Sequence, residues 1–210
     1  MTVSQAEQFW EQQYRSHHSR WSGRPNPVLV DVVTPLPAGM ALDLGCGEGG
    51  DAVWLASLGW QVTAVDVSAT ALDRVAVHAA SAGVADLVER QRHDLTHSFP
   101  AGVFDLVSAQ YLQSPVVLPR EQVLRAVAAA VAPGGLLLVV DHASAPPWAW
   151  HDPDHQPRFP TPQETLATLE LNPDQWHAER VAASEREAIG PQGQSARVTD
   201  NVIAIRRLPR

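Results

Sequence analysis

Hydrophobic and polar positions along the chain alternate between two periods, and this alternation predicts an α/β fold. Short apolar runs at 40–44, 60–67, 87–95, 104–112 and 136–142 have the length and composition of buried strands. Segments with a helical period separate several of them, at about 51–59, 68–83 and 120–132. Strands connected by helices form a parallel sheet that is covered on both faces.

The last part of the chain has a different pattern. After a short helix near 161–169, two long β-type runs at 176–189 and 195–208 are joined by the turn signal GPQGQ, which indicates an antiparallel hairpin. We therefore expect a Rossmann-like, doubly wound, mostly parallel sheet of seven strands that ends in an antiparallel hairpin.

The length of 210 residues suits a single domain. We expect an N-terminal helix and lid segment (1–37), a ligand-binding core (38–142), a loop rich in proline and tryptophan (143–162), and a C-terminal helix and hairpin (163–210). The 17 prolines cluster at 24–37 and 143–162. The second cluster is too long for an ordinary connection, which favours a functional loop.

Charge and composition exclude several classes of partner and chemistry. The net charge is −8, and all 15 basic residues are arginine, so neither a Schiff-base lysine nor a phosphate-loop lysine is available. An acidic chain without a basic cluster argues against nucleic-acid binding. No apolar run reaches the ~20 residues of a membrane span, and the N-terminus lacks the apolar core of a signal peptide. We expect a cytoplasmic monomer or homodimer.

A glycine-rich stretch, LDLGCGEGGD at 42–51, follows the first strand directly. Ligands of such sheets bind at the carboxyl ends of the strands, and a glycine-rich turn lets them approach the backbone. Asp66 ends the second strand, where its carboxylate can accept hydrogen bonds from ribose hydroxyls. Two spacings fit: Gly45, Gly47 and Gly50 form G-x-G-x-x-G, the dinucleotide fingerprint, whereas Asp43 with Gly45, Gly47 and Gly49 forms D-x-G-x-G-x-G.

The second pattern resembles the first motif of class I S-adenosylmethionine-dependent methyltransferases. HDL at 93–95, FDLVSAQYL at 104–112 and VAPGGLLLVV at 131–140 resemble later elements of that family, in the same order. The resemblance implies S-adenosyl-L-methionine as cofactor, with Asp43 near its ammonium group, where a pyrophosphate would be repelled. The cofactor-binding residues that it implies in this region are Asp43, Gly45, Cys46, Gly47, Gly49, Asp66, Val67, Asp94, Leu95 and Gln110.

The N-terminal stretch at 9–27, FWEQQYRSHHSRWSGRPNP, is similar to the entry segment of the thiopurine and tellurite-resistance branch of that superfamily. This similarity implies that Trp10, Tyr14 and Trp21 cover the sulfonium, because a cation over an aromatic face gains roughly 0.5–2 kcal/mol. The alternative is that Phe9, Trp10 and Tyr14 pack an amphipathic helix onto the sheet. The sequence leaves both interpretations open.

The acceptor is expected to be a small molecule that binds beyond the fourth and fifth strands. Catalytic candidates are Tyr111 and His142, with His142 as a possible base at the end of the fifth strand. Gln110, Asp141 and the polar and aromatic residues at 148–155 are further candidates. A thiol or chalcogen acceptor needs no strong protein base, whereas an oxygen or nitrogen acceptor is helped by one. The acceptor atom stays open.

The remaining reactive residues indicate less. Cys46 is the only cysteine, which we interpret as a small filler of the glycine loop rather than a nucleophile. His142 and the histidines and aspartates at 151–155 match no metal-ligand spacing, so no metal is expected. Two rival functions remain at this stage: an NAD(P)-binding oxidoreductase that uses the dinucleotide fingerprint, and a non-catalytic S-adenosylmethionine-binding protein.

Overall fold

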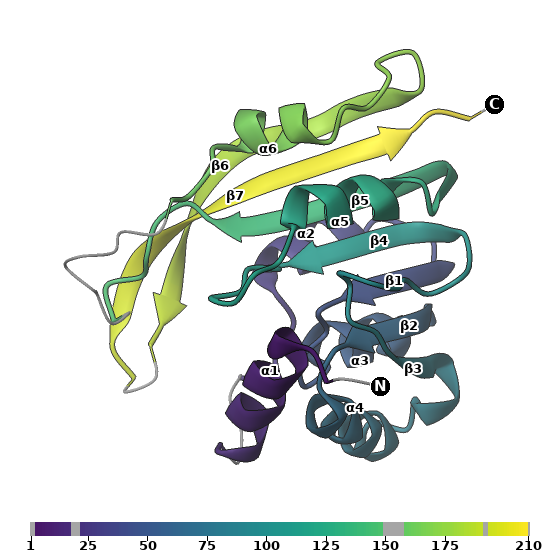
Figure 1. Ribbon diagram of the computed structural model, residues 1–210. Coiled ribbons are helices and arrows are strands. Elements are labelled where there is room, and N and C mark those ends of the chain that lie inside the picture. Colours follow the sequence, from purple (N-terminus) through teal and green to yellow (C-terminus); the bar gives the residue numbers. More distant parts are fainter. Residues whose placement is uncertain (1–2, 18–21, 149–157, 191–192, 210) are drawn as a thin grey trace.

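A computed structural model describes residues 3–17, 22–148, 158–190 and 193–209. Its centre is a seven-stranded sheet with the order β3-β2-β1-β4-β5-β7-β6, as Figure 1 shows. The strands are β1 (Met40–Leu44), β2 (Gln61–Asp66), β3 (Val88–Arg92), β4 (Phe104–Gln110), β5 (Val131–His142), β6 (Trp176–Ile189) and β7 (Ser195–Arg207). The first five are parallel, and β7 pairs antiparallel with both β5 and β6. The expected fold class and C-terminal hairpin are confirmed.

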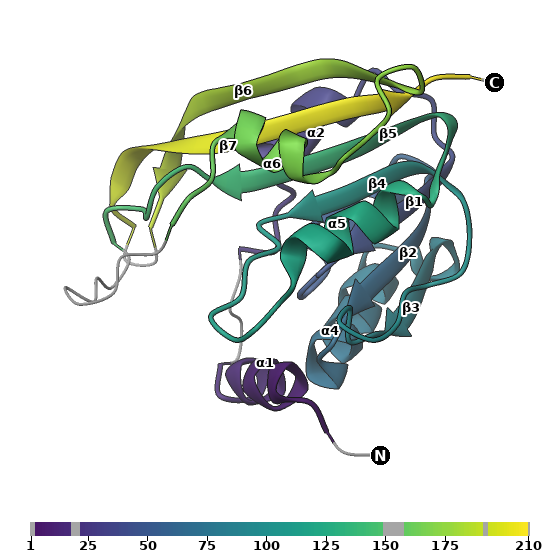
Figure 2. The ribbon, with the colours of Figure 1, turned by 45° about the horizontal axis from the view of Figure 1, so that its top comes forward.

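Helices cover both faces of this sheet (Figure 2). They are α1 (Gln5–Arg15), α2 (Pro27–Val33), α3 (Gly50–Ser57), α4 (Ala69–Ser81), α5 (Arg120–Ala128) and α6 (Pro162–Thr168), with a 3₁₀ turn η1 (Ala85–Leu87) before β3. Buried residues of α2, α3 and α4 pack with one face of the strands, and those of α5 pack with the other. Neither buried cluster contains a residue of α1.

Most element boundaries follow the sequence signals. Asn26 and Ser68 cap α2 and α4 with their side-chain oxygens, and Thr161 forms a capping box with Glu164 at the start of α6. The predicted hairpin strands at 176–189 and 195–208 match β6 and β7 within one residue.

The segment before the fifth strand was predicted incorrectly. The expected helix over 120–132 ends at Ala128, and β5 begins at Val131 rather than at Leu136. Val131 pairs with Phe104, and a register shift follows before Leu136 pairs with Leu106. This irregularity accommodates Pro133 without a helix, because proline and glycine tolerate a bulge but not the middle of a helix. The third predicted strand is also too long, since β3 ends at Arg92.

The strand order reverses at one point of the sheet, beside β1. The chain passes from β1 to β2 and β3 on one side and to β4 and β5 on the other, so the strand order reverses beside β1. Ligands of open α/β sheets bind outside the carboxyl ends of the strands at such a point. In Figure 1, α1 lies beside α4 on the side toward which the arrowheads of β4 and β5 point.

Candidate active site

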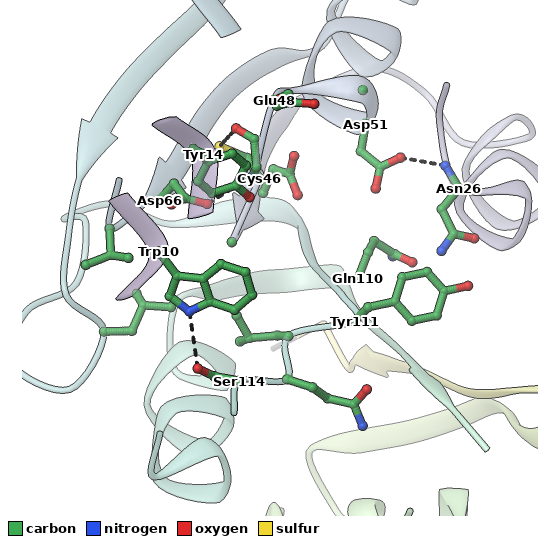
Figure 3. A pocket seen from close by; sticks show the side chains of 18 of the residues that line it. Trp10, Tyr14, Asn26, Cys46, Glu48, Asp51, Asp66, Gln110, Tyr111 and Ser114 are labelled. Carbon is green, nitrogen blue, oxygen red and sulfur yellow. Dashed lines mark hydrogen bonds between the residues drawn. The ribbon is translucent and has the colours of Figure 1, made fainter. Parts of the chain in front are cut away.

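A cavity of about 510 Å³ lies at this switch point, within the usual size range of ligand pockets. Figure 3 shows its lining side chains. Predicted site residues that line it are Trp10, Tyr14, Asp43, Gly45, Cys46, Gly47, Asp66, Val67, Asp94, Leu95, Gln110, Tyr111 and His142. Trp21 lies outside the described residues. Gly49 is not among the lining residues, and a Cβ there would lie 2.9 Å from Val75 of α4.

The glycine loop has the backbone that its second sequence pattern requires. Gly45, Gly47 and Gly49 have φ angles of 67°, 54° and 85°, in the left-handed region that favours glycine. Gly50 has another reason to be glycine, since a Cβ there would lie 2.8 Å from the carbonyl oxygen of Arg24. The three left-handed glycines are therefore those of D-x-G-x-G-x-G, and the fourth admits the N-terminal segment.

Asp43 is a buried acid with unused hydrogen-bonding capacity. Asp43 is 2% exposed, and its Oδ2 atom has no hydrogen-bond partner among the described residues. Burial, followed by the charges of Asp51 and Asp66, raises the pKa of Asp43 well above its ordinary value. A buried acceptor without a donor is costly, so a cationic donor in the cavity would stabilise the ionised form of Asp43.

Asp66 fixes the glycine loop from the end of β2. Its Oδ2 accepts a hydrogen bond from the backbone N–H of Gly47 at 3.0 Å, and its Oδ1 accepts one from the N–H of Ser68 at 2.9 Å. Burial raises the pKa of Asp66 to about 6, although these hydrogen bonds oppose the shift. Each carboxylate oxygen can accept a further bond, so the predicted ribose contact is compatible with this loop-holding role.

A third acid, Asp51, was missed as a site residue. It lies in the first turn of α3 and accepts a hydrogen bond from the backbone N–H of Asn26 at 2.6 Å (Figure 3). Burial raises the pKa of Asp51 to about 6. Asn26 itself is 7% exposed, and its Nδ2 atom has no hydrogen-bond partner among the described residues. Asn26 thus adds an unused donor to a cavity that is otherwise rich in carboxylates.

Asp94 lies at the far end of the cavity, in the loop after β3. Its Oδ1 accepts hydrogen bonds from the N–H and the hydroxyl of Thr96, and its Oδ2 lies 3.4 Å from Nδ1 of His97. Burial opposes ionisation, but hydrogen bonds from Ser4 and Thr96 outweigh it and lower the pKa of Asp94. Asp94 therefore presents an ionised oxygen beside Leu95 and Val67.

Helix α1 is fastened over this region by polar contacts. Glu11 accepts hydrogen bonds from the hydroxyls of Ser68 and Thr70 at 2.6 and 2.7 Å and from the Thr70 N–H at 3.2 Å. Burial by itself would raise the pKa of Glu11, but these hydrogen bonds outweigh it and lower the pKa to about 2. Arg74 of α4 pairs with the buried Glu48 and donates to the Tyr14 carbonyl oxygen at 2.7 Å. The start of α4 thereby connects α1 to the glycine loop.

Two of the three aromatic residues of α1, Trp10 and Tyr14, line the cavity. Trp10 donates from Nε1 to the Ser114 hydroxyl at 3.2 Å, which links α1 to the loop after β4 (Figure 3). Tyr14 is 4% exposed, and its ring centroid lies 6.2 Å from that of Trp10. Neither residue belongs to the two buried clusters of the sheet. This placement favours the interpretation as a cover over packing onto the sheet.

A hydrogen-bonded and stacked network connects four side chains at the part of the cavity that Tyr111 and His142 line. The Tyr111 hydroxyl donates to Asp200 Oδ2 at 2.9 Å, and Arg186 donates to the same oxygen from Nε at 2.5 Å. Arg186 also donates from Nη2 to the Tyr111 hydroxyl oxygen at 2.8 Å. His142 stacks on Tyr111 with ring centroids 4.1 Å apart, and its Nδ1 lies 3.8 Å from Asp200 Oδ1.

The protonation states of this network follow from burial. Burial, with the nearby Asp200 charge, raises the pKa of Tyr111, so its hydroxyl stays protonated. Burial lowers the pKa of His142, against the opposing influence of Asp200, so the imidazole is neutral near pH 7. Tyr111 also has a φ of 51°, which is unfavourable for a residue with a side chain. Such strain persists only where surrounding contacts hold it, and it clusters at functional sites.

Four residues of the site were not predicted from the sequence: Asn26, Asp51, Arg186 and Asp200. Asn26 precedes Pro27, which is a helix-start signal, and Asp51 directly follows the glycine loop. Arg186 and Asp200 have no local signal. Asp200 reaches the site because it is the cross-strand partner of His142, and the β6–β7 hairpin brings Arg186 next to it.

Other predicted residues lie elsewhere. Asp141 is not among the lining residues, and it pairs with Arg120. Burial, together with the nearby charge of Asp66, raises the pKa of the Cys46 thiol, so the thiol remains protonated. Residues 149–157, which include all the candidates at 148–155 except Trp148, lie outside the described residues. Among the residues that the structure describes, no group of three or more histidine, cysteine, aspartate or glutamate side chains is arranged to hold a metal.

The fold and site together define a nucleoside-binding α/β protein of the methyltransferase type. A family profile described as a methyltransferase domain matches residues 41–135. Ubiquinone biosynthesis O-methyltransferase of Caulobacter sp. (strain K31) is 37% identical over 106 residues, which are 50% of this chain and 42% of that protein. Thiocyanate methyltransferase 1 of Brassica oleracea is 30% identical over 149 residues, 66% of each chain.

The solved structures agree with this assignment at the level of the fold. A structure from work on the conversion of a disulfide bond into a thioacetal group during echinomycin biosynthesis has a TM-score of 0.73 and 21% identity, and covers 96% of this chain and 91% of its own. Residues 41–135 of this chain match the methyltransferase domain family, and its methyltransferase relatives place this domain in the class I S-adenosylmethionine-dependent superfamily. It spans less than half of the length of the first curated relatives that it matches. Among the described residues, no helix is long and apolar enough to cross a membrane.

Proposed function

We propose that this protein transfers the methyl group of S-adenosyl-L-methionine to a small-molecule nucleophile. The observation that carries the proposal is Asp43, a buried carboxylate beside the glycine loop with an unpartnered oxygen. The cofactor has an ammonium group that Asp43 can bind, and an overall positive charge that suits a cavity with three buried acids. A pyrophosphate-containing cofactor would be repelled by the same acids.

The cavity offers a contact for each part of this cofactor. Asp66 accepts hydrogen bonds from the ribose, Asp94 accepts one from the adenine amino group, and Asn26 donates one to the carboxylate. Gly45 and Gly47 let the cofactor approach the loop backbone, and Cys46, Val67, Leu95 and Gln110 complete the lining. Trp10 and Tyr14 cover the site from α1, and Trp21 is assigned to the same cover by the sequence alone.

The acceptor binds at the opposite end, next to Tyr111 and His142. When bound, the cofactor supplies an activated methyl group on a sulfonium centre. His142 is a neutral imidazole with one nitrogen toward Asp200, so its other nitrogen is free to take a proton from an oxygen, nitrogen or thiol acceptor. Tyr111 and the cover on α1 position the acceptor and exclude water, which contributes to the rate through proximity.

Thiols and chalcogens head the proposed acceptors. A thiol ionises readily, so it makes the smallest demand on a single, incompletely aligned histidine. The similarity to thiocyanate methyltransferase 1 of Brassica oleracea and to probable thiol methyltransferase 2 of Arabidopsis thaliana supports this choice, as does the N-terminal similarity to the thiopurine and tellurite-resistance branch.

We further propose that the protein works in the cytoplasm as a monomer or homodimer, without a nucleic-acid partner. The net charge of −8 and the absence of lysine support the last point. The expected division of the chain belongs to the same proposal: an N-terminal helix and lid segment (1–37), a cofactor-binding core (38–142), an acceptor loop (143–162), and a C-terminal helix and hairpin (163–210).

Calorimetry and a methyl-transfer screen test this function. We expect S-adenosylmethionine and S-adenosylhomocysteine to bind with micromolar affinity and NAD not to bind. Asp43→Asn, which keeps the shape and removes the charge, should weaken S-adenosylmethionine binding at least tenfold. The screen covers thiols, selenite, tellurite, amines and phenols. Saturable NAD binding without S-adenosylmethionine binding would overturn the proposal.

A further inference from the structure

Arg186 is an anchored guanidinium at the acceptor end of the cavity. It lies on β6 and lines the cavity together with Tyr111, which directly follows β4, and His142, which ends β5. Its Nε and Nη2 donate to Asp200 and to the Tyr111 hydroxyl oxygen, at 2.5 and 2.8 Å. Asp200 is fully buried, whereas the Arg186 side chain is 24% exposed. The guanidinium is therefore held from the protein side.

The same guanidinium keeps unused donors. The Nη1 atom of Arg186 has no hydrogen-bond partner among the described residues. A guanidinium has five N–H donors in a rigid planar fork, so fixing Nε and Nη2 also fixes the direction of the two Nη1 hydrogens. The Nη1 hydrogens can donate charge-assisted hydrogen bonds to a carboxylate or other oxyanion, and such bonds are stronger than those to neutral oxygens.

The two ends of the cavity differ in the charge that they offer. Asp43, Asp51 and Asp66 lie in or are tied to the glycine-loop region, whereas Arg186 contacts Tyr111, on which His142 stacks. Asp200 balances Arg186, but it is buried behind it with its oxygens engaged by Tyr111 and Arg186. An anion beside Nη1 therefore meets the N–H donors of Arg186 and not the oxygens of Asp200. A cationic cofactor at the glycine loop would also attract this anion.

We propose that the methyl acceptor carries an anionic oxygen group, a carboxylate, which binds the Nη1 hydrogens of Arg186. This inference rests on the proposed function, because it assigns the acceptor class of that same site. The nucleophilic atom lies on the cofactor side of the carboxylate, and Arg186 is the residue that selects charged over neutral acceptors.

The test separates acceptor charge from cofactor binding. Binding of acetate and benzoate, and of acetamide and benzamide as neutral counterparts, is measured by calorimetry on the full chain saturated with S-adenosylhomocysteine. Saturation with S-adenosylhomocysteine fills the subsite for the cofactor's carboxylate, so the added acids cannot bind there. We expect at least one acid to bind ten times more tightly than its amide, and Arg186→Met to reduce that ratio below two. Arg186→Lys, which keeps the charge and loses the fork, should retain an intermediate preference.

Arg197→Met is the matched control, because Arg197 lies on the neighbouring strand β7, is mostly exposed and pairs only with Glu185 and Glu187 among the described residues. It should keep the full preference for acids. The inference is overturned if the wild type binds neither acid more tightly than its amide, or if Arg186→Met and Arg186→Lys both keep the wild-type ratio. Failure of the proposed function looks different, since S-adenosylhomocysteine itself would then not bind.

Turnover provides a second readout. With 3-mercaptopropionate and its methyl ester as acceptors, the wild type should favour the acid at least tenfold in kcat/KM, mainly through KM. Arg186→Met should lose this preference. Turnover of the ester in preference to the acid would leave the methyltransferase assignment intact and refute the carboxylate subsite.

Discussion

The two ends of the cavity are built in different ways. The cofactor end comes largely from one continuous stretch, residues 43–51, to which Asp66 is tied by the Gly47 N–H. Its acids are buried, raised in pKa and partly without donors. The proposed acceptor end joins Tyr111, which follows β4, to His142 of β5 and Arg186 of β6, and the buried Asp200 connects them.

This difference indicates which end is complete before a ligand arrives. Unpaired buried acids are costly, and a cationic ligand relieves that cost, so binding energy at the cofactor end comes from the ligand. At the acceptor end, mutual hydrogen bonds already hold the side chains in place, which is the preorganisation that chemistry needs. Changes at the first end should therefore affect affinity, and changes at the second should affect turnover and selectivity.

The largest expected effect is on affinity, from Gly47→Val. Gly47 has a φ of 54°, and a β-branched side chain is strained there and would also block the backbone from the ligand. We expect S-adenosylhomocysteine to bind at least about 100-fold more weakly by calorimetry, which corresponds to about 2.7 kcal/mol.

Gly83→Val is the matched control for this variant. Gly83 has a φ of 71° in the turn after α4, and a Cβ there meets nothing within 4 Å. It should lower the melting temperature through the same backbone strain and leave the affinity for S-adenosylhomocysteine within threefold. Equal affinity in Gly47→Val and the wild type would remove the glycine loop from the site.

The next effect concerns the cover that joins the two ends. Glu11→Gln weakens charged hydrogen bonds to Ser68 and Thr70, each of which contributes roughly 1.5–3 kcal/mol. Because α1 packs outside the buried clusters, we expect cofactor affinity and turnover to fall roughly tenfold while the melting temperature stays close to that of the wild type. Glu7→Gln, at the more exposed pair with Arg92, should change little. A parallel loss of stability and activity would instead indicate that α1 is part of the folded core.

Acidic pH provides a smaller and reversible test of the cofactor end. Burial raises the pKa of Asp51 and Asp66 to about 6, above their unfolded values, so the ligand-free folded state binds more protons than the unfolded state between about pH 4 and 6. Their contribution to stability therefore falls as the pH rises through this window and is constant above it.

A cationic cofactor prefers the ionised acids, so the sign for binding is opposite. If one group with a pKa of about 6 must ionise, the dissociation constant of S-adenosylmethionine should be about tenfold higher at pH 5 than at pH 7. Calorimetry in two buffers with different ionisation enthalpies should show proton release at pH 6. A pH-independent affinity would show that cofactor binding does not require Asp51 or Asp66 to ionise.

The same contrast explains what the sequence could and could not predict. The sheet, the hairpin and the cofactor end depend on local periodicity, helix caps and the motif at 43–51, which can be recognised in a linear sequence. The acceptor end depends on strand register: Asp200 faces His142 only because β7 pairs antiparallel with β5. Arg186 then reaches both through the β6–β7 pairing. Hydrophobic periodicity does not reveal which residues of two strands pair. The helix was also predicted to continue up to Pro133, whereas Pro133 lies in an irregular part of β5.

The smallest expected effect tests the boundary between the two ends. Cys46 is the only cysteine, and its position in the glycine loop places it in the cofactor half. Burial and the nearby Asp66 raise its pKa, so it stays a thiol, which is a poor nucleophile compared with a thiolate. The proposed methyl acceptor, by contrast, approaches from the Tyr111 side.

We therefore expect Cys46→Ala to keep kcat within about threefold of the wild type, because removing a half-buried thiol changes packing only slightly. Mass spectrometry of the wild type after many turnovers should find no methyl group on Cys46. An S-methylcysteine at this position would place the transferable methyl group toward the glycine loop. In that case the acceptor end assigned to Tyr111, His142 and Arg186 would be on the wrong side of the cavity, and the two halves would have to exchange roles.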